Sequence, residues 1–192
     1  MTTEEPDFER VSKAYELLQR QPGPAVITEL IALAERGSLM SMIYLGWIYK
    51  RGLGAEIDPA QSEYWYSRAI AGGSTLAIYH LGHLYLDSLD YVKAADVFEK
   101  GASINYPPAM FCLGCMYLEG QGVSRDFEKA RLLFKRAADQ KNVFDKRKLA
   151  AMYLTGKYGL RDFFNRVSLF CSVFWDLFVI FRSDPNSDKL LT

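Results

Sequence analysis

The residues of this chain best suited to metal chemistry form two pairs with the same spacing. His80 and His83, the only histidines, lie three residues apart, as do Cys112 and Cys115. Imidazole nitrogens and thiolates are the usual ligands of tetrahedral zinc, so neighbouring helices carrying these pairs could hold one ion. The alternative is structural, because Cys-Leu-Gly-Cys lacks a tight zinc knuckle and cysteine is a common small buried residue. We therefore predict no stoichiometric zinc and no cofactor.

No other motif indicates catalytic chemistry. The sequence contains no phosphate-binding loop, zinc-protease motif or nucleophile elbow. Gly52-Leu53-Gly54 and Gly120-Gln121-Gly122 have the glycine spacing of a nucleotide-binding turn, but both follow helical patterns rather than strands. A redox role for Cys112 and Cys115 is disfavoured, since the Cys-x-x-Cys motif of redox proteins normally opens a helix after a strand. The sequence therefore predicts a protein that is not an enzyme.

An internal repeat organises the elements that carry these residues. The motif Leu-Gly-x-x-Tyr begins at Leu45, Leu81 and Leu113, and a fourth copy, beginning at Leu149, keeps the leucine and the tyrosine. Successive copies are 36, 32 and 36 residues apart. Self-similarity at this period is typical of stacked helical hairpins, in which each copy buries its apolar face against its neighbours. The predicted fold is an all-α solenoid of stacked helix-turn-helix repeats.

Each copy shows signals for the ends of its helices. In the first copy, helix A covers about 39–49, a glycine loop follows, and Asp58-Pro59 opens helix B, because aspartate caps the first amides and proline loses no hydrogen bond there. Gly72-Gly73 then ends helix B. The second copy differs, because Asp90 lies five residues after Tyr85. In the other copies the corresponding aspartate lies nine residues after the motif tyrosine, so four loop residues are missing here.

Upstream of the first full copy, the pattern predicts two further helices. One covers about 7–19 and forms an N-terminal cap or a degenerate helix A, and the other, 25–36, matches the end of a helix B. The predicted organisation is an N-terminal helical cap (1–24), a partial repeat (25–37), four repeats (38–73, 74–105 with the short loop, 106–141, and 142–181 with an extended apolar helix) and a disordered tail (182–192).

The third copy carries a family resemblance. Its matching positions are Ala109, Leu113, Gly114, Tyr117, Gly120, Gly122, Val123, Asp126, Lys129, Ala130, Phe134, Ala137 and Ala138. This pattern resembles the Sel-one-like repeat family, a subgroup of the tetratricopeptide-type solenoids, over about residues 25–174. The resemblance implies a right-handed superhelix whose A helices line the concave side. It also implies an adaptor or scaffold that assembles complexes, often in bacterial envelope, secretion or signalling systems.

The positions just before the motif leucine, and two after it, vary between copies, so we expect them to face the concave groove or its rim. They are Tyr44, Trp47, His80, His83, Cys112, Cys115 and Lys148. Tyrosine and tryptophan are enriched in binding hot spots, although Trp47 could instead pack against the preceding helices. The predicted function is a scaffold or adaptor that binds a protein or peptide segment in this groove.

An apolar stretch follows the last motif copy. Its uninterrupted part, 167–181, has about fifteen residues and includes Asp176, whereas a bilayer span needs ~20 apolar residues. A terminal repeat normally has a polar outer face. We therefore expect a partner, a second copy of the chain or a membrane interface to cover this helix, and a true membrane span is a further alternative. The candidate association surface comprises Phe170, Phe174, Trp175, Phe178 and Phe181.

The apolar helix also supports an alternative function, a membrane-peripheral accessory protein of an envelope or polysaccharide assembly system. Composition narrows the remaining possibilities. With 23 basic and 23 acidic residues and no basic block, the chain is not expected to bind nucleic acid. Three cysteines are too few for a disulfide framework. The acidic N-terminus lacks the features of a secretory signal, so we expect a cytoplasmic protein, with membrane association as the alternative.

Overall fold

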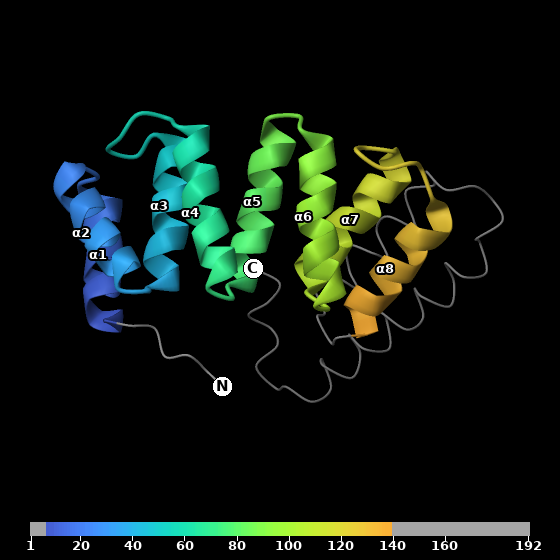
Figure 1. Ribbon diagram of the computed structural model, residues 1–192, viewed down its shortest axis with the longest axis horizontal. Coiled ribbons are helices and arrows are strands. Elements are labelled where there is room, and N and C mark those ends of the chain that lie inside the picture. Colours follow the sequence, from blue (N-terminus) through green and yellow to red (C-terminus); the bar gives the residue numbers. More distant parts are fainter. Residues whose placement is uncertain (1–6, 140–192) are drawn as a thin grey trace, which may run out of the picture. The chain divides into compact units, whose positions relative to one another are not determined.

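The computed structural model describes residues 7–139, which fold into α-helices that follow one another along the chain (Figure 1). The helices are α1 (Phe8–Arg20), α2 (Pro24–Glu35), α3 (Leu39–Arg51), α4 (Pro59–Ala71), α5 (Thr75–Asp87), α6 (Tyr91–Ser103), α7 (Pro107–Glu119) and α8 (Phe127–Asp139). No strand occurs in this part of the chain. Helices α1 and α2 correspond to the two predicted upstream helices, and α3 and α4 form the first predicted hairpin.

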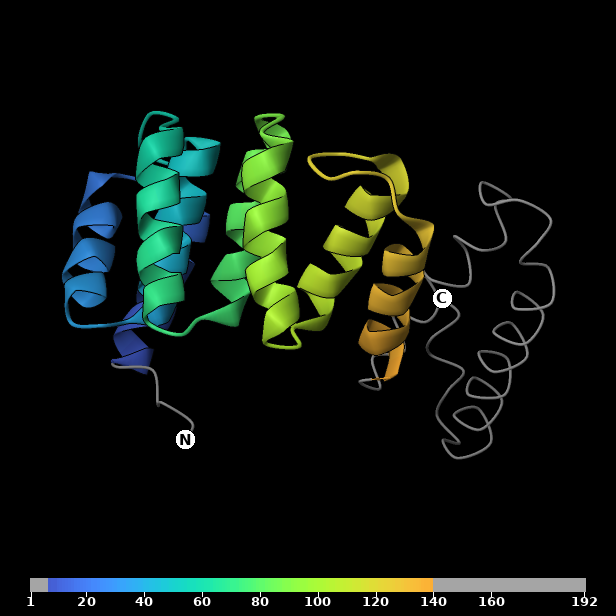
Figure 2. The same cartoon turned by 45° about the vertical axis from the view of Figure 1, so that its right-hand side comes forward.

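Within the compact unit that extends to Leu133, the helices pack side by side in chain order (Figures 1 and 2). Helix α1 also contacts α3, α3 contacts α5, and α5 contacts α7, whereas α2, α4 and α6 do not approach one another as closely. We therefore call α3, α5 and α7 the inner helices and α2, α4 and α6 the outer helices. The prediction of an all-α solenoid of helical repeats is confirmed. The direction of its superhelical twist stays a prediction.

Side-chain caps determine where several helices begin. The Asp58 carboxylate accepts hydrogen bonds from two first-turn amides of α4 at 3.0 Å, and Pro59 is the first residue of that helix, as predicted. Ser38 and Ser74 cap α3 and α5 in the same way through their hydroxyl oxygens. These caps satisfy amides that have no partner within the helix, so they favour helix starts at these residues.

The glycine of the Leu-Gly-x-x-Tyr motif lies where an inner helix crosses its paired outer helix. A methyl group at Gly46 would lie 2.5 Å from the Tyr66 ring, and one at Gly82 would overlap the Phe98 ring. Both rings are completely buried. The Ser62 hydroxyl on α4 donates a hydrogen bond of 2.8 Å to the Gly46 carbonyl, which ties the two helices together at the crossing. The close packing of each pair therefore requires a residue without a side chain at this position.

Candidate functional site

The inner helices carry no formal charge before their last turn. Residues 39–49, 75–86 and 107–118 contain no aspartate, glutamate, lysine or arginine, whereas charged residues are spread along α4 and α6. We define the inner face as the part-exposed residues Tyr44, Trp47, Tyr79, His80, His83, Phe111, Cys112 and Cys115. A charged ligand would lose hydration on such a surface without gaining an opposite charge, so the inner face is suited to an uncharged ligand. The absence of charged residues from these helices can be read from the sequence once the helix boundaries are known.

The predicted groove residues Tyr44 and Trp47 both lie on α3 and are partly exposed. The Tyr44 ring stacks on Tyr15 of α1, with ring centroids 4.8 Å apart and an interplanar angle of 22°. Tyr15 was not among the predicted site residues, because α1 lies outside the repeated motif. The structure adds Tyr15 to the N-terminal end of the inner face, where the residue remains 38% exposed.

The two histidines share Tyr79 as a neighbour but stack differently. His80 stacks on Tyr66 of α4, with centroids 5.6 Å apart, whereas His83 lies against Tyr79 at 4.3 Å. The His83 Nε2 atom is 3.8 Å from the Cys112 sulfur, so α5 and α7 bring together one histidine and one cysteine. Among residues 7–139, no three histidine, cysteine, aspartate or glutamate side chains gather as a set of metal ligands. The four-ligand arrangement considered from the sequence is therefore not assembled.

The electrostatic surroundings keep both histidines neutral. Burial, the positive charge of Lys50 and the neighbouring His83 lower the pKa of His80. Burial and Lys50 likewise lower the pKa of His83, with Asp87 acting in the opposite direction. The Lys50 ammonium is itself paired with the Asp87 carboxylate at 2.7 Å, near the C-terminal ends of α3 and α5. At neutral pH, the centre of the inner face is thus uncharged despite its two histidines.

Acidification is expected to destabilise the protein through these histidines. Because their folded-state pKa values lie below the ordinary value of 6.5, the unfolded chain binds more protons, and stability is lost as the pH falls below 6.5. Melting temperatures measured from pH 7.5 to pH 5 should show this loss. The melting temperature of the double variant His80→Gln with His83→Gln should fall less over the same pH interval. Equal decreases in melting temperature for the wild type and the double variant would contradict the role of the two histidines in this pH dependence.

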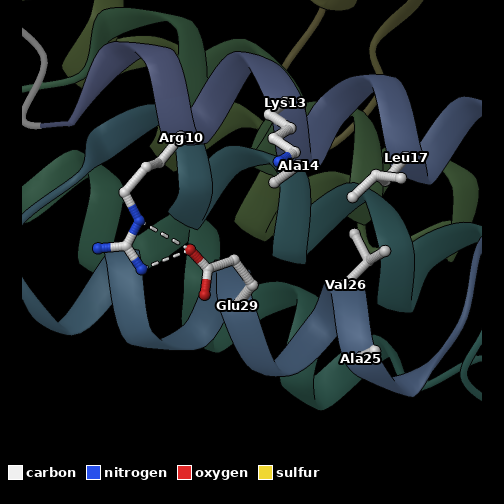
Figure 3. Close-up of a pocket in the computed structure, with 7 residues that line it drawn as sticks. All are labelled: Arg10, Lys13, Ala14, Leu17, Ala25, Val26 and Glu29. Carbon is white, nitrogen blue, oxygen red and sulfur yellow. Dashed lines mark hydrogen bonds and ion pairs between the residues drawn. The ribbon is translucent and has the colours of Figure 1, made fainter.

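A hollow of about 310 Å³ lies between α1 and α2, away from the inner face. Arg10 on α1 and Glu29 on α2 face one another across it and form an ion pair of 2.6 Å, while Leu17 and Val26 approach from the two helices at its other end (Figure 3). This hollow was not predicted from the sequence. Its ion pair links the first two helices, which accounts for the presence of Arg10 and Glu29 in its lining.

The remaining predicted residues lie outside the described part of the chain. They are Lys148 of the groove and the association surface Phe170, Phe174, Trp175, Phe178 and Phe181. The fourth repeat beyond residue 141 and the C-terminal tail lie there as well. Across residues 7–139, every helix is too short or too polar to cross a bilayer.

Comparison with known families agrees with the boundaries of the inner helices. The model of the Sel1 repeat matches residues 39–74, 75–103, 107–142 and 147–164, which is more than half of the chain. The protein belongs to the Sel1 repeat family. The first three matches begin at the first residue of α3, α5 and α7. Sel1 repeat proteins are generally protein–protein interaction scaffolds rather than enzymes.

Known Sel1 repeat proteins resemble this one in sequence and in fold. It is 30% identical over 125 residues to the sel1-like repeat-containing protein L21 of Acanthamoeba polyphaga mimivirus, covering 65% of this chain and 23% of that protein. It is 36% identical over 103 residues to HRD3B of Arabidopsis thaliana, an ERAD-associated E3 ubiquitin-protein ligase component, covering 50% of this chain and 16% of that one. The chain thus spans less than a quarter of either relative.

Solved structures show the same architecture. The crystal structure of a Sel1 repeat protein from Oxalobacter formigenes superimposes with a TM-score of 0.64 at 22% sequence identity. The match covers 84% of the chain described here and 67% of the Oxalobacter formigenes chain. At this level of identity the likeness establishes the fold, while the ligand has to be inferred from the residues of this chain.

Proposed function

We propose that this Sel1 repeat protein is a scaffold that binds an uncharged segment of a partner protein on its inner face. The observation that carries the proposal is the coincidence of part-exposed rings and absent charge on successive inner helices. Tyr44, Trp47 and Tyr79 supply large contact areas at little cost in side-chain entropy. An uncharged partner segment leaves no buried ion unpaired when it covers these rings.

The packing of the inner face also supports binding. Tyr44 is held against Tyr15, Tyr79 against His83, and His80 against Tyr66, so these rings have defined orientations before a partner arrives. Side chains that are already ordered lose less freedom when a ligand binds, which increases affinity. Among the relatives, HRD3B is a component of a ubiquitin-ligase assembly, which agrees with a role in bringing proteins together.

Removing two rings of the inner face should weaken partner binding by at least about tenfold, because truncating an aromatic hot-spot residue costs about 2 kcal/mol or more. The variant is Tyr44→Ala with Trp47→Ala in the full chain. Proteins captured by wild-type and variant chains from the native cell would be quantified by mass spectrometry, with circular dichroism to check that both are folded.

A matched control removes two exposed apolar side chains away from the inner face. Val92 on α6 and Leu132 on α8 are 61% and 57% exposed. Val92→Ala with Leu132→Ala should retain the proteins captured by the wild type. If the Tyr44 and Trp47 variant retains them as well, the inner face is not the binding surface and the proposal is wrong.

A further inference from the structure

The glycine loops of the first and third copies rest on the start of a preceding outer helix. A methyl group at Gly54 would lie 2.5 Å from the backbone nitrogen of Gly23, directly before α2. At Gly122 it would overlap the backbone of Tyr91, the first residue of α6. Each full-length loop therefore packs against the N-terminal turn of the outer helix that precedes its own hairpin.

The second copy cannot make this contact, because its loop is four residues shorter. Only residues 88–90 connect α5 to α6, and the short connection is visible beside the longer α3–α4 and α7–α8 connections (Figure 1). A full-length loop in the second copy would cover the N-terminal turn of α4. A cavity of about 290 Å³ occurs at this place, with Pro59 and Glu63 of α4 in its lining. The other lining residues include Lys50, Tyr85, Asp87 and Lys93.

The charges around the cavity are unequally satisfied. Lys50 is paired with Asp87 at 2.7 Å, and Lys93 with Asp90 at 3.4 Å. Lys93 also lies 5.3 Å from the centre of the Tyr85 ring. Glu63 is the third carboxylate of the lining. It accepts a hydrogen bond from the Tyr85 hydroxyl, but among the described residues no lysine or arginine forms an ion pair with it. The cavity thus contains one more acidic group than basic groups.

The cavity lies close to the inner face, near the histidines of α5. Asp87 follows His83 by four residues and His80 by seven, so the three side chains lie along one side of α5. Lys50 connects the two places, since its charge acts on the two histidines of the inner face and its side chain lines the cavity. A segment bound across the inner face can therefore reach the cavity near the C-terminal end of α5.

We propose that this cavity receives an arginine or lysine side chain of the partner segment, with the basic group paired to the Glu63 carboxylate. The inference rests on the proposed function, because the rest of that segment lies uncharged on the inner face. It assigns the partner a specific composition: an uncharged, apolar or aromatic stretch with one basic residue beside it. The missing loop residues of the second copy provide the space for this side chain.

Selection from phage-displayed random dodecapeptides on the immobilised full chain tests this composition. We expect selected peptides to combine one lysine or arginine with an uncharged stretch. Glu63→Gln preserves volume and removes the charge, and it should weaken binding of the selected peptides about tenfold. Inserting Gly-Gln-Gly-Val after Ser88, which restores the loop length of the third copy, should abolish the preference for a basic residue.

The matched control is Glu99→Gln. Glu99 accepts a hydrogen bond from the motif tyrosine Tyr117 at 3.3 Å, as Glu63 does from Tyr85. Glu99 lies beside a copy with the complete loop, so removing its charge should leave peptide binding unchanged. Two outcomes would overturn the cavity assignment alone, both with peptides that require Tyr44 and Trp47. In the first, these peptides show no preference for a basic residue. In the second, the preference persists in the Glu63→Gln variant. If no selected peptide depends on Tyr44 and Trp47, the proposed function fails, and the cavity assignment fails with it.

Discussion

Replacing Gly122 with alanine is expected to lower the free energy of unfolding by about 2–4 kcal/mol. Gly122 has a backbone φ of 69°, in the left-handed region where an alanine costs ~1–2 kcal/mol. In addition, the new methyl group would overlap the backbone of Tyr91. Backbone at the start of a helix cannot rotate away as a side chain can, so the loop would have to detach from α6.

Urea denaturation followed by circular dichroism measures this effect, and Gly120→Ala is its control. Gly120 has a similar φ of 73°, but a methyl group there would meet its nearest neighbour, Arg125, at an ordinary 3.6 Å. Gly120→Ala should therefore cost only the backbone strain, ~1–2 kcal/mol. Equal denaturation midpoints for the two variants would show that the Gly122 loop does not pack on the preceding helix.

Gly82→Ala should destabilise the protein by about 1–3 kcal/mol, although alanine is the better helix former by ~1 kcal/mol. The methyl group would overlap the ring of Phe98, which is completely buried where α5 crosses α6. An aromatic ring that is surrounded on all sides cannot shift without disturbing its own neighbours. The intrinsic gain in helix propensity is thus outweighed by overpacking.

A double-mutant cycle identifies the clash as the cause. In a Phe98→Leu background the smaller side chain leaves room for the methyl group, so Gly82→Ala should cost at least about 1 kcal/mol less there. Gly23→Ala provides the reference, since a methyl group at Gly23 would meet no atom within 4 Å. Additive effects of Gly82→Ala and Phe98→Leu would show that the loss arises elsewhere.

These two glycines illustrate how different constraints underlie one repeated pattern. Gly82 is needed because a ring of the paired outer helix fills the space beside it, whereas Gly122 is needed for its backbone angle and its contact with the preceding pair. Both loop glycine pairs follow helices, as predicted, and their second glycines contact protein backbone. Packing within the stack thus explains a spacing that resembles a nucleotide-binding turn.

Much of the fold could be predicted from the sequence, because helix ends and helix pairing depend on residues that are near one another in the chain. The motif spacing indicated stacked hairpins, and Asp58-Pro59 marked the start of α4. The missing residues between Tyr85 and Asp90 were visible as well. Each of these features acts over one helical turn or one loop, where local hydrogen bonding and backbone geometry decide the structure.

Only the tertiary structure decided which side chains meet across helices. His80 and His83 share a spacing with Cys112 and Cys115, yet His80 stacks on Tyr66 and only His83 approaches Cys112. Likewise, the shortened loop showed its consequence, an open cavity beside Glu63, only once the neighbouring hairpins were in place. Spacing along the chain determines the face of a helix on which a residue lies, whereas contacts between helices depend on how closely and at what angle the helices pack.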